Sequence, residues 1–148
     1  MATSAPLIAT GRGVLQLAKG HVGERYVLGV LAPKDNNTWK GPWDCSEFAS
    51  WLIFQTARVL YGCDRDFGAP GTAKAFTGYW ERDAGMFGEI ISVDEAARTP
   101  GAAVLRVPQP GATGHIVISD GFGRTVEAHS SKDGVIESTL LPRDAPQL

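Results

Sequence analysis

Apolar and polar positions divide this chain into a helical first part and a strand-rich last part. Before residue 98, apolar residues recur at helical intervals or in long runs, which is typical of helices. After Gly101 they form short runs separated by turns rich in glycine and proline, which is typical of strands. Helices followed by strands predict an α+β fold, with N-terminal helices packed on a C-terminal antiparallel β-meander.

The strongest helical pattern covers residues 45–61, where apolar side chains fall on most sides of the expected helix. Asp44 precedes this segment as a candidate N-cap, and Glu47 stands at the third helical position, as in a capping box. Gly62 is expected to end the helix. Weaker patterns predict shorter helices over residues 14–22, 72–82 and 93–98.

Four β-rich runs follow, over residues 103–107, 115–119, 125–129 and 135–138. Because the turns between them are short, neighbouring runs are expected to pair as antiparallel strands. The length of 148 residues is enough for one domain with a hydrophobic core. We therefore expect a single domain over residues 1–148, with its core at about 13–138 and a surface tail at 139–148.

Charge and hydropathy exclude several classes of function. The formal net charge is −2 and no run is rich in Lys or Arg, so nucleic-acid binding has no support. No segment approaches the roughly 20 apolar residues of a membrane span. The first ten residues lack the basic and apolar parts of a signal peptide. We expect a protein made in the cytoplasm without a classical export signal.

Two cysteines, Cys45 and Cys63, are too few for a disulfide framework or a metal-binding cluster. If both belong to one long helix, they lie about 27 Å apart at 1.5 Å per residue. A disulfide needs Cα atoms within about 7 Å. We expect two free thiols, and neither a metal nor a cofactor.

Cys45 is the candidate nucleophile because it lies in the first turn of the strongest helix. The positive end of the helix dipole favours a thiolate, which is the reactive form of cysteine. The alternative is a small buried side chain that only packs, the usual fate of a free cysteine.

His115 and His129 are the candidate base and its orienting group. His115 begins one β run and His129 ends the next, so the hairpin between them places the two side by side, unless a bulge intervenes. The alternatives are a polar residue at a turn for His115 and a solvated strand end for His129. His21 is interpreted as a cation that favours the end of a helix.

The residues around Cys45 also have two interpretations. Asp44 caps the helix and is in addition a candidate contact for a substrate amine. Tyr26 either packs in the core or points its hydroxyl group at the nucleophile. Trp39 and Trp43 precede the nucleophile in an expected loop, where they are candidates for the rim of a cleft.

In this order, the chain resembles the NlpC/P60 family of cell-wall cysteine peptidases. The resemblance rests on segments 26–29, 44–48, 114–121, 126–129 and 134–135. It implies an unpermuted, papain-like NlpC/P60 fold in which Cys45 is the nucleophile, His115 the general base and His129 the orienting residue. Tyr26, Asp44 and Ser46 then correspond to substrate-binding residues, and Trp43 is added as a rim residue.

The substrate implied by the resemblance is the peptide stem of bacterial peptidoglycan, cut at the D-glutamyl–diamino-acid bond. Without a visible export signal, such a hydrolase would reach the periplasm or cell wall by non-classical delivery. It would then be a secreted antibacterial effector, with a secretion machine and an immunity protein as partners, or a phage-associated lysin. Wall recycling inside the cell is another option.

Several positions depart from the family pattern. Glu47 stands where the family commonly has glycine, and Val30 and Ala102 replace a glycine and an aspartate. Residues 62–99 carry no recognisable motif. Two other functions therefore remain open. One is an amidase, transpeptidase or acyltransferase acting on another substrate, and the other is a binding module without catalysis.

Overall fold

The computed structural model describes residues 10–64, 68–111 and 113–140, and within them it confirms the predicted α+β order. The elements are α1 (Gly11–Lys19), α2 (Cys45–Ala57), α3 (Thr77–Phe87), α4 (Val93–Ala97), β1 (Ala103–Arg106), β2 (His115–Ser119), β3 (Arg124–Ser130) and β4 (Gly134–Thr139).

The four strands form one antiparallel sheet in the order β1-β2-β3-β4, so the predicted meander is confirmed. His115, the first residue of β2, is paired with Arg106, the last residue of β1. Gly121 and Gly123 lie between β2 and β3 with φ of 87° and 83°, a conformation that side chains with a Cβ rarely adopt. These glycines allow the short turn that reverses the chain.

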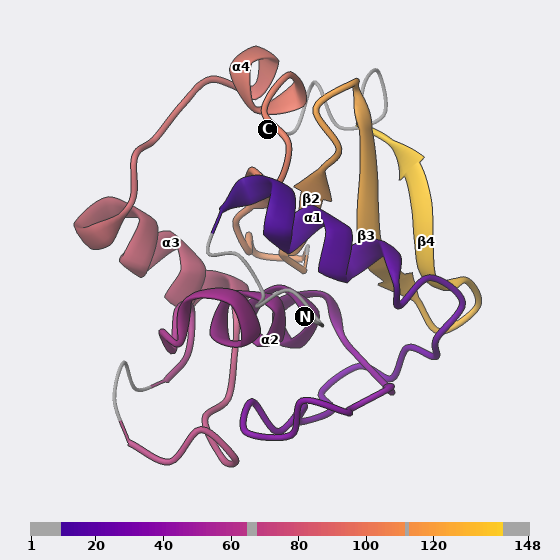
Figure 1. Ribbon diagram of the computed structural model, residues 1–148. Coiled ribbons are helices and arrows are strands. Elements are labelled where there is room, and N and C mark those ends of the chain that lie inside the picture. Colours follow the sequence, from indigo (N-terminus) through magenta and orange to yellow (C-terminus); the bar gives the residue numbers. More distant parts are fainter. Residues whose placement is uncertain (1–9, 65–67, 112, 141–148) are drawn as a thin grey trace, which may run out of the picture.

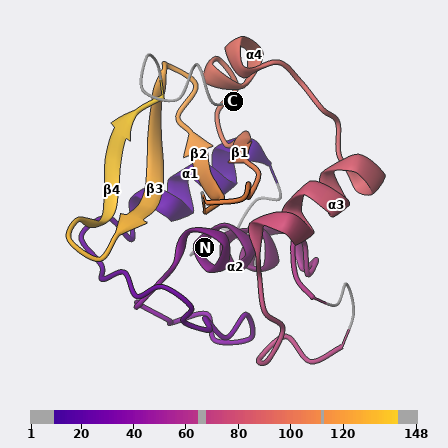
Figure 2. The ribbon, with the colours of Figure 1, turned by 180° about the vertical axis from the view of Figure 1, so that it is seen from behind.

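Helices pack against the middle strands of the sheet and against its β1 edge. α1 and α2 contact each other and pack on β2 and β3 (Figure 1). α3 and α4 contact β1, which Figure 2 shows from behind. The first turn of α2 and the beginning of β2 are therefore held close together, although they are far apart in the sequence.

Side chains along β2 point alternately to the two faces of the sheet, and each face contributes to a different hydrophobic cluster. Ile116 and Ile118 pack with Phe48, Trp51 and other buried residues in the main cluster. Val117 belongs to a second cluster with Val104 of β1, two alanines of α4 and Leu140. Both faces of this strand are thus buried, which fixes its register relative to the helices.

Helix boundaries differ from the prediction by up to five residues, and α1 covers residues 11–19 instead of 14–22. α2 ends at Ala57 because Arg58 adopts a left-handed conformation with φ of 59°, so the helix does not continue to residue 61. α3 begins at Thr77, five residues later than expected. Residues 73–75 stay extended because their backbone groups bond to Lys34, Asp64 and Glu47 instead of to a helix.

The predicted surface tail does not begin at residue 139. Thr139 is the last residue of β4, and Leu140 is fully buried in the second cluster. Strand pairing with β3 and the apolar contacts of Leu140 account for the difference. The rest of the expected tail, residues 141–148, lies outside the described residues.

Candidate active site

Cys45 is the first residue of α2, as the sequence predicted. Asp44 adopts an extended conformation and its Oδ1 accepts the Glu47 N–H at 2.8 Å, which confirms it as the N-cap. The thiol therefore lies at the positive end of a 13-residue helix. Cys45 is 8% exposed, so it is sheltered but reachable from the cleft that it lines.

This cleft has a volume of about 540 Å³. It is lined by Asp44 and the first turn of α2, residues 44–47, which we call its floor, and by two chain segments, residues 28–31 and 74–77, which we call its walls. Arg106, residues 113–115 and residues 129–131 contribute the side formed by the sheet. The cleft thus brings the α-helical and β-sheet parts of the chain together around one thiol.

His115 is held by a carboxylate. Its Nε2 lies 3.0 Å from Oε1 of Glu127, so Nδ1 is the ring nitrogen left for the thiol. Burial alone would lower the pKa of His115, but hydrogen bonds with Cys45 and Glu127, together with their negative charges, raise it to about 9. Its contacts with Glu127 and Cys45 therefore favour the protonated form of the ring.

Glu127 makes the contact with the His115 ring that was predicted for His129. It lies on β3, is 1% exposed, and also accepts a hydrogen bond from the Thr125 hydroxyl group. A buried carboxylate with such contacts has little freedom to rotate. Glu127, rather than His129, is hydrogen-bonded to the His115 ring.

His129 is near His115 but has other partners. Their ring centroids are 6.1 Å apart and the rings are perpendicular, so the predicted proximity is present. However, Nδ1 of His129 lies 3.0 Å from Oδ2 of Asp133 and 3.3 Å from the Ser130 hydroxyl group. The pairing of β3 with β4 shifts between Ala128 and Ser130, and such a bulge redirects the side chain at its centre.

Tyr26 lines the cleft and also packs against the main core cluster, so both of its predicted roles apply in part. Burial raises its pKa to about 12, with further contributions from the negative charges of Cys45 and Asp44. A backbone hydrogen bond from Cys45 partly opposes this shift. The hydroxyl group therefore keeps its proton and lies beside the backbone of Cys45.

Asp44 and Ser46 flank Cys45 and line the cleft. Besides capping α2, Asp44 accepts the Gly29 N–H at 3.2 Å and the Ser46 hydroxyl group at 3.3 Å. Burial raises the pKa of Asp44, and these donors partly oppose the shift. The carboxylate thus joins the floor of the cleft to the wall that contains Gly29.

Trp43 is not a rim residue, and this prediction is wrong. Its side chain is fully buried, with Nε1 donating to Oε1 of Glu24 at 2.8 Å. Its ring packs edge-on against Phe48 and Trp51 and against His21, whose Nδ1 bonds to the same Glu24 oxygen at 2.7 Å. The short bridge between Tyr26 and Trp43 turns the indole inward, away from the cleft.

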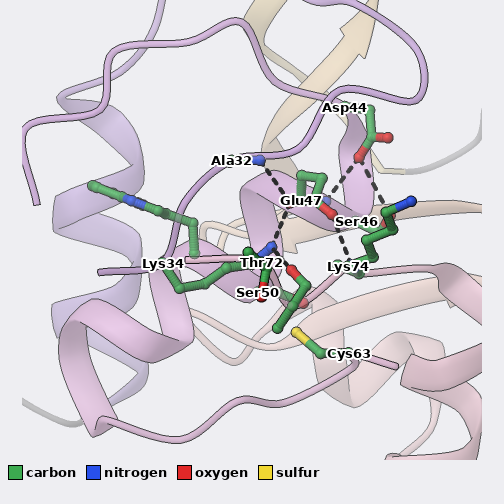
Figure 3. A network of polar contacts seen from close by, with 12 residues as sticks. Ala32, Lys34, Asp44, Ser46, Glu47, Ser50, Cys63, Thr72 and Lys74 are labelled. Carbon is green, nitrogen blue, oxygen red and sulfur yellow. Dashed lines mark hydrogen bonds and ion pairs between the residues drawn. The ribbon is translucent and has the colours of Figure 1, made fainter. Parts of the chain in front are cut away.

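Glu47 does not close a capping box. Its carboxylate instead accepts the Ala32 N–H and forms a buried ion pair with Lys34 (Figure 3). It also accepts the Ala75 N–H. Burial raises the pKa of Glu47, and the positive charge of Lys34 opposes this shift. The ammonium group of Lys34 therefore compensates the negative charge of Glu47, two residues after Cys45.

The described residues show two further absences. They contain no group of three or more His, Cys, Asp or Glu side chains placed to hold a metal ion. Of the helices within residues 10–64, 68–111 and 113–140, none has the length and hydropathy needed to cross a membrane. Cys45 and Cys63 are both free, as predicted.

The solved structures to which this chain is similar include NlpC/P60 domains. The NlpC/P60 domain of the peptidoglycan hydrolase SagA is 25% identical, with a TM-score of 0.58 over 88% of this chain and 89% of that one. The P60 domain of the Mycobacterium avium subspecies paratuberculosis antigen MAP1204 is 21% identical, with a TM-score of 0.57 over 87% of both chains. NlpC1 from Trichomonas vaginalis is 16% identical, with a TM-score of 0.61 over 96% of this chain but only 42% of its own length.

No family sequence model matches the chain, and no curated protein matches it in sequence. The assignment therefore rests on the fold. The chain has the NlpC/P60 fold, and the resemblance predicted from its sequence is confirmed.

Proposed function

We propose that this protein is a cysteine hydrolase that cuts an amide bond in peptidoglycan stem peptides, at the junction of D-glutamate and the diamino acid. The observation that carries this proposal is the His115 ring held by Glu127 and interacting with Cys45 within one cleft. The likeness to the NlpC/P60 domain of a peptidoglycan hydrolase supports the choice of substrate.

Catalysis begins from the thiolate–imidazolium pair. The Cys45 sulfur attacks the carbonyl carbon, and the negative charge moves to the carbonyl oxygen. The candidate donors to that oxygen are the Tyr26 hydroxyl group and the backbone N–H of Cys45, which would turn to it from the Tyr26 oxygen. Collapse of the intermediate breaks the C–N bond, while His115 gives its proton to the leaving amine.

The second half of the reaction releases the acyl group. His115, now neutral, takes a proton from water, and the resulting hydroxide attacks the thioester carbonyl. The C–S bond breaks and the thiolate of Cys45 returns. Through both halves, the Glu127 carboxylate keeps Nε2 of His115 in place, so the same ring nitrogen serves as acid and then as base.

Purified stem peptides test this mechanism. Cys45→Ala and His115→Ala should each lower kcat by roughly 10³-fold or more, because each removes a reacting group. Mass analysis of the fragments identifies the bond that is cut. Cys63→Ala is the matched control, since Cys63 is buried outside the cleft and its loss should leave cleavage intact. Cleavage by both active-site variants at the wild-type rate would refute the mechanism.

Delivery of the enzyme to the wall belongs to the same proposal. A secretion machine or a phage particle would carry it to the periplasm or cell wall, and an immunity protein would protect a cell that produces it as an antibacterial effector. Expression with an added export signal should lyse a bacterial host, while the Cys45→Ala variant should not. Growth unaffected by the exported wild-type protein would contradict action on the wall.

A further inference from the structure

The floor and two walls of the cleft meet at one buried side chain, Glu47. Oε1 of Glu47 accepts the Ala32 N–H at 2.8 Å, next to the wall formed by residues 28–31. Oε2 accepts the Ala75 N–H at 2.7 Å, in the wall formed by residues 74–77. One carboxylate, two residues after the nucleophile, therefore ties both walls to α2 (Figure 3).

Lys34 adds a second set of links between the same segments. It is fully buried, and its Nζ donates both to Glu47 and to the Ala73 carbonyl group, the latter at 2.7 Å. Its own carbonyl group accepts from Gln55 of α2 at 2.7 Å. The ammonium group thus lies between α2 and the second wall, while its backbone is anchored to the helix.

Stability alone explains this pair poorly. Removing two charges from water costs about as much as their attraction returns, and apolar side chains of similar size often serve a core equally well. Hydrogen bonds, however, are directional, so they fix the distances between the groups that they join. A binding cleft requires fixed distances between its floor and its walls, and this pair lies where those three segments meet.

We propose that Glu47 and Lys34 are positioning residues that hold the two walls of the cleft at a fixed separation around Cys45. The inference rests on the proposed function, because its consequence concerns binding of the stem peptide. The pair acts through the walls and not on the reacting bond, since Cys45 and His115 keep their own contacts. Loss of the pair should weaken substrate binding and leave the chemical step unchanged.

A double variant tests the proposal. Glu47→Gln alone would leave the Lys34 ammonium group buried without its carboxylate, so Lys34→Met/Glu47→Gln is the better choice because it removes both charges at similar volume. We expect KM for a stem peptide to rise at least about fivefold, as for a lost hydrogen bond, with kcat within about twofold of wild type.

Asp83→Asn is the matched control. Asp83 is also a buried carboxylate in an ion pair, with Arg82, and it accepts a backbone N–H, from Gly62 at 2.8 Å. Neither Asp83 nor Arg82 lines the cleft. We expect this variant to lose stability while KM stays at the wild-type value. An equal rise of KM in both variants, or none in the folded double variant, would overturn the positioning role.

Amide hydrogen exchange tests the pair without relying on activity. In the double variant, exchange should accelerate at Ala32 and Ala75 and in the two walls, but not in the sheet. Asp83→Asn should leave the walls protected. Unchanged exchange in the walls of the double variant would refute the proposal, whereas wild-type protein that cleaves no stem peptide would refute the proposed function instead.

Discussion

At the scale of single residues, Glu127 influences both the protonation and the orientation of the His115 ring. The imidazole is partly buried, which by itself would favour the neutral ring. A carboxylate 3.0 Å from Nε2 stabilises the charged ring and fixes its orientation, and the thiol adds to both effects. The protonation state needed for catalysis therefore depends on a residue that does not itself contact the substrate bond.

Glu127→Gln should narrow the pH range of activity. Because His115 must be protonated in the active pair and its pKa is about 9, kcat/KM of the wild type should fall as the pH rises through about 9. The amide group of the introduced Gln has no charge, so the pKa of His115 should fall. The alkaline decrease of kcat/KM should then occur at lower pH than in the wild type. We also expect kcat/KM at its optimum to decrease roughly tenfold or more.

Asp133→Asn serves as the control for this pH profile. It removes the charged partner of His129 at the exposed turn after β3 and leaves Glu127 in place. Its alkaline limb should coincide with that of the wild type. If the alkaline decrease of kcat/KM shifted in Asp133→Asn but not in Glu127→Gln, the orienting role would belong to His129 instead.

The sequence predicted two of the three residues in this contact. Cys45 follows an N-capping residue before the longest apolar run, and His115 begins a β run, so their positions depend on local patterns. Glu127 could not be distinguished from His129, because both follow in one short run and the choice depends on a bulge in β3. A charged residue between Val126 and Ala128 was the available signal.

At the scale of elements, the junction of α2 and α3 has almost no free space. Gly62 has φ of 72°, and a Cβ added there would lie 2.2 Å from the Trp80 ring. Trp80 in turn donates to the Ser50 hydroxyl group at 2.9 Å, across the two helices. The glycine is needed for both its conformation and its lack of a side chain.

Gly62→Ala should therefore destabilise the fold by about 3 kcal/mol, because strain and overlap with Trp80 add together. Gly85→Ala is a matched substitution inside α3, where an added Cβ meets nothing within 4 Å. It should stabilise the protein by roughly 0.5–1 kcal/mol through helix propensity. Denaturant unfolding measures both changes, and equal stability of the two variants would contradict this account.

Strands were easier to predict than helix boundaries. Each strand lies within one residue of its expected limits, because alternation and turns are local signals. α3 was misplaced because tertiary contacts of residues 73–75 override a weak helical pattern. The buried Lys34–Glu47 pair could not be predicted, since its partners come from segments that meet only in the folded chain.

At the scale of the whole molecule, the helical and β-sheet parts are joined by backbone as well as by the core. Gly23 donates to the Val135 carbonyl group, and Val135 donates to that of Glu24, both at 2.9 Å. The cleft lies between these parts and takes residues from each. The two-part pattern of the sequence predicted this architecture, but not which loops form the walls.

Cys63 differs from Cys45 in a way that has a practical consequence. It is completely buried, and burial raises its pKa to about 11, so it remains a thiol over the usual range of pH. An electrophilic probe should thus modify one sulfur per folded molecule and two per unfolded molecule. The natural chain, with no engineered cysteine, supplies both an active-site titrant and an internal measure of the folded fraction.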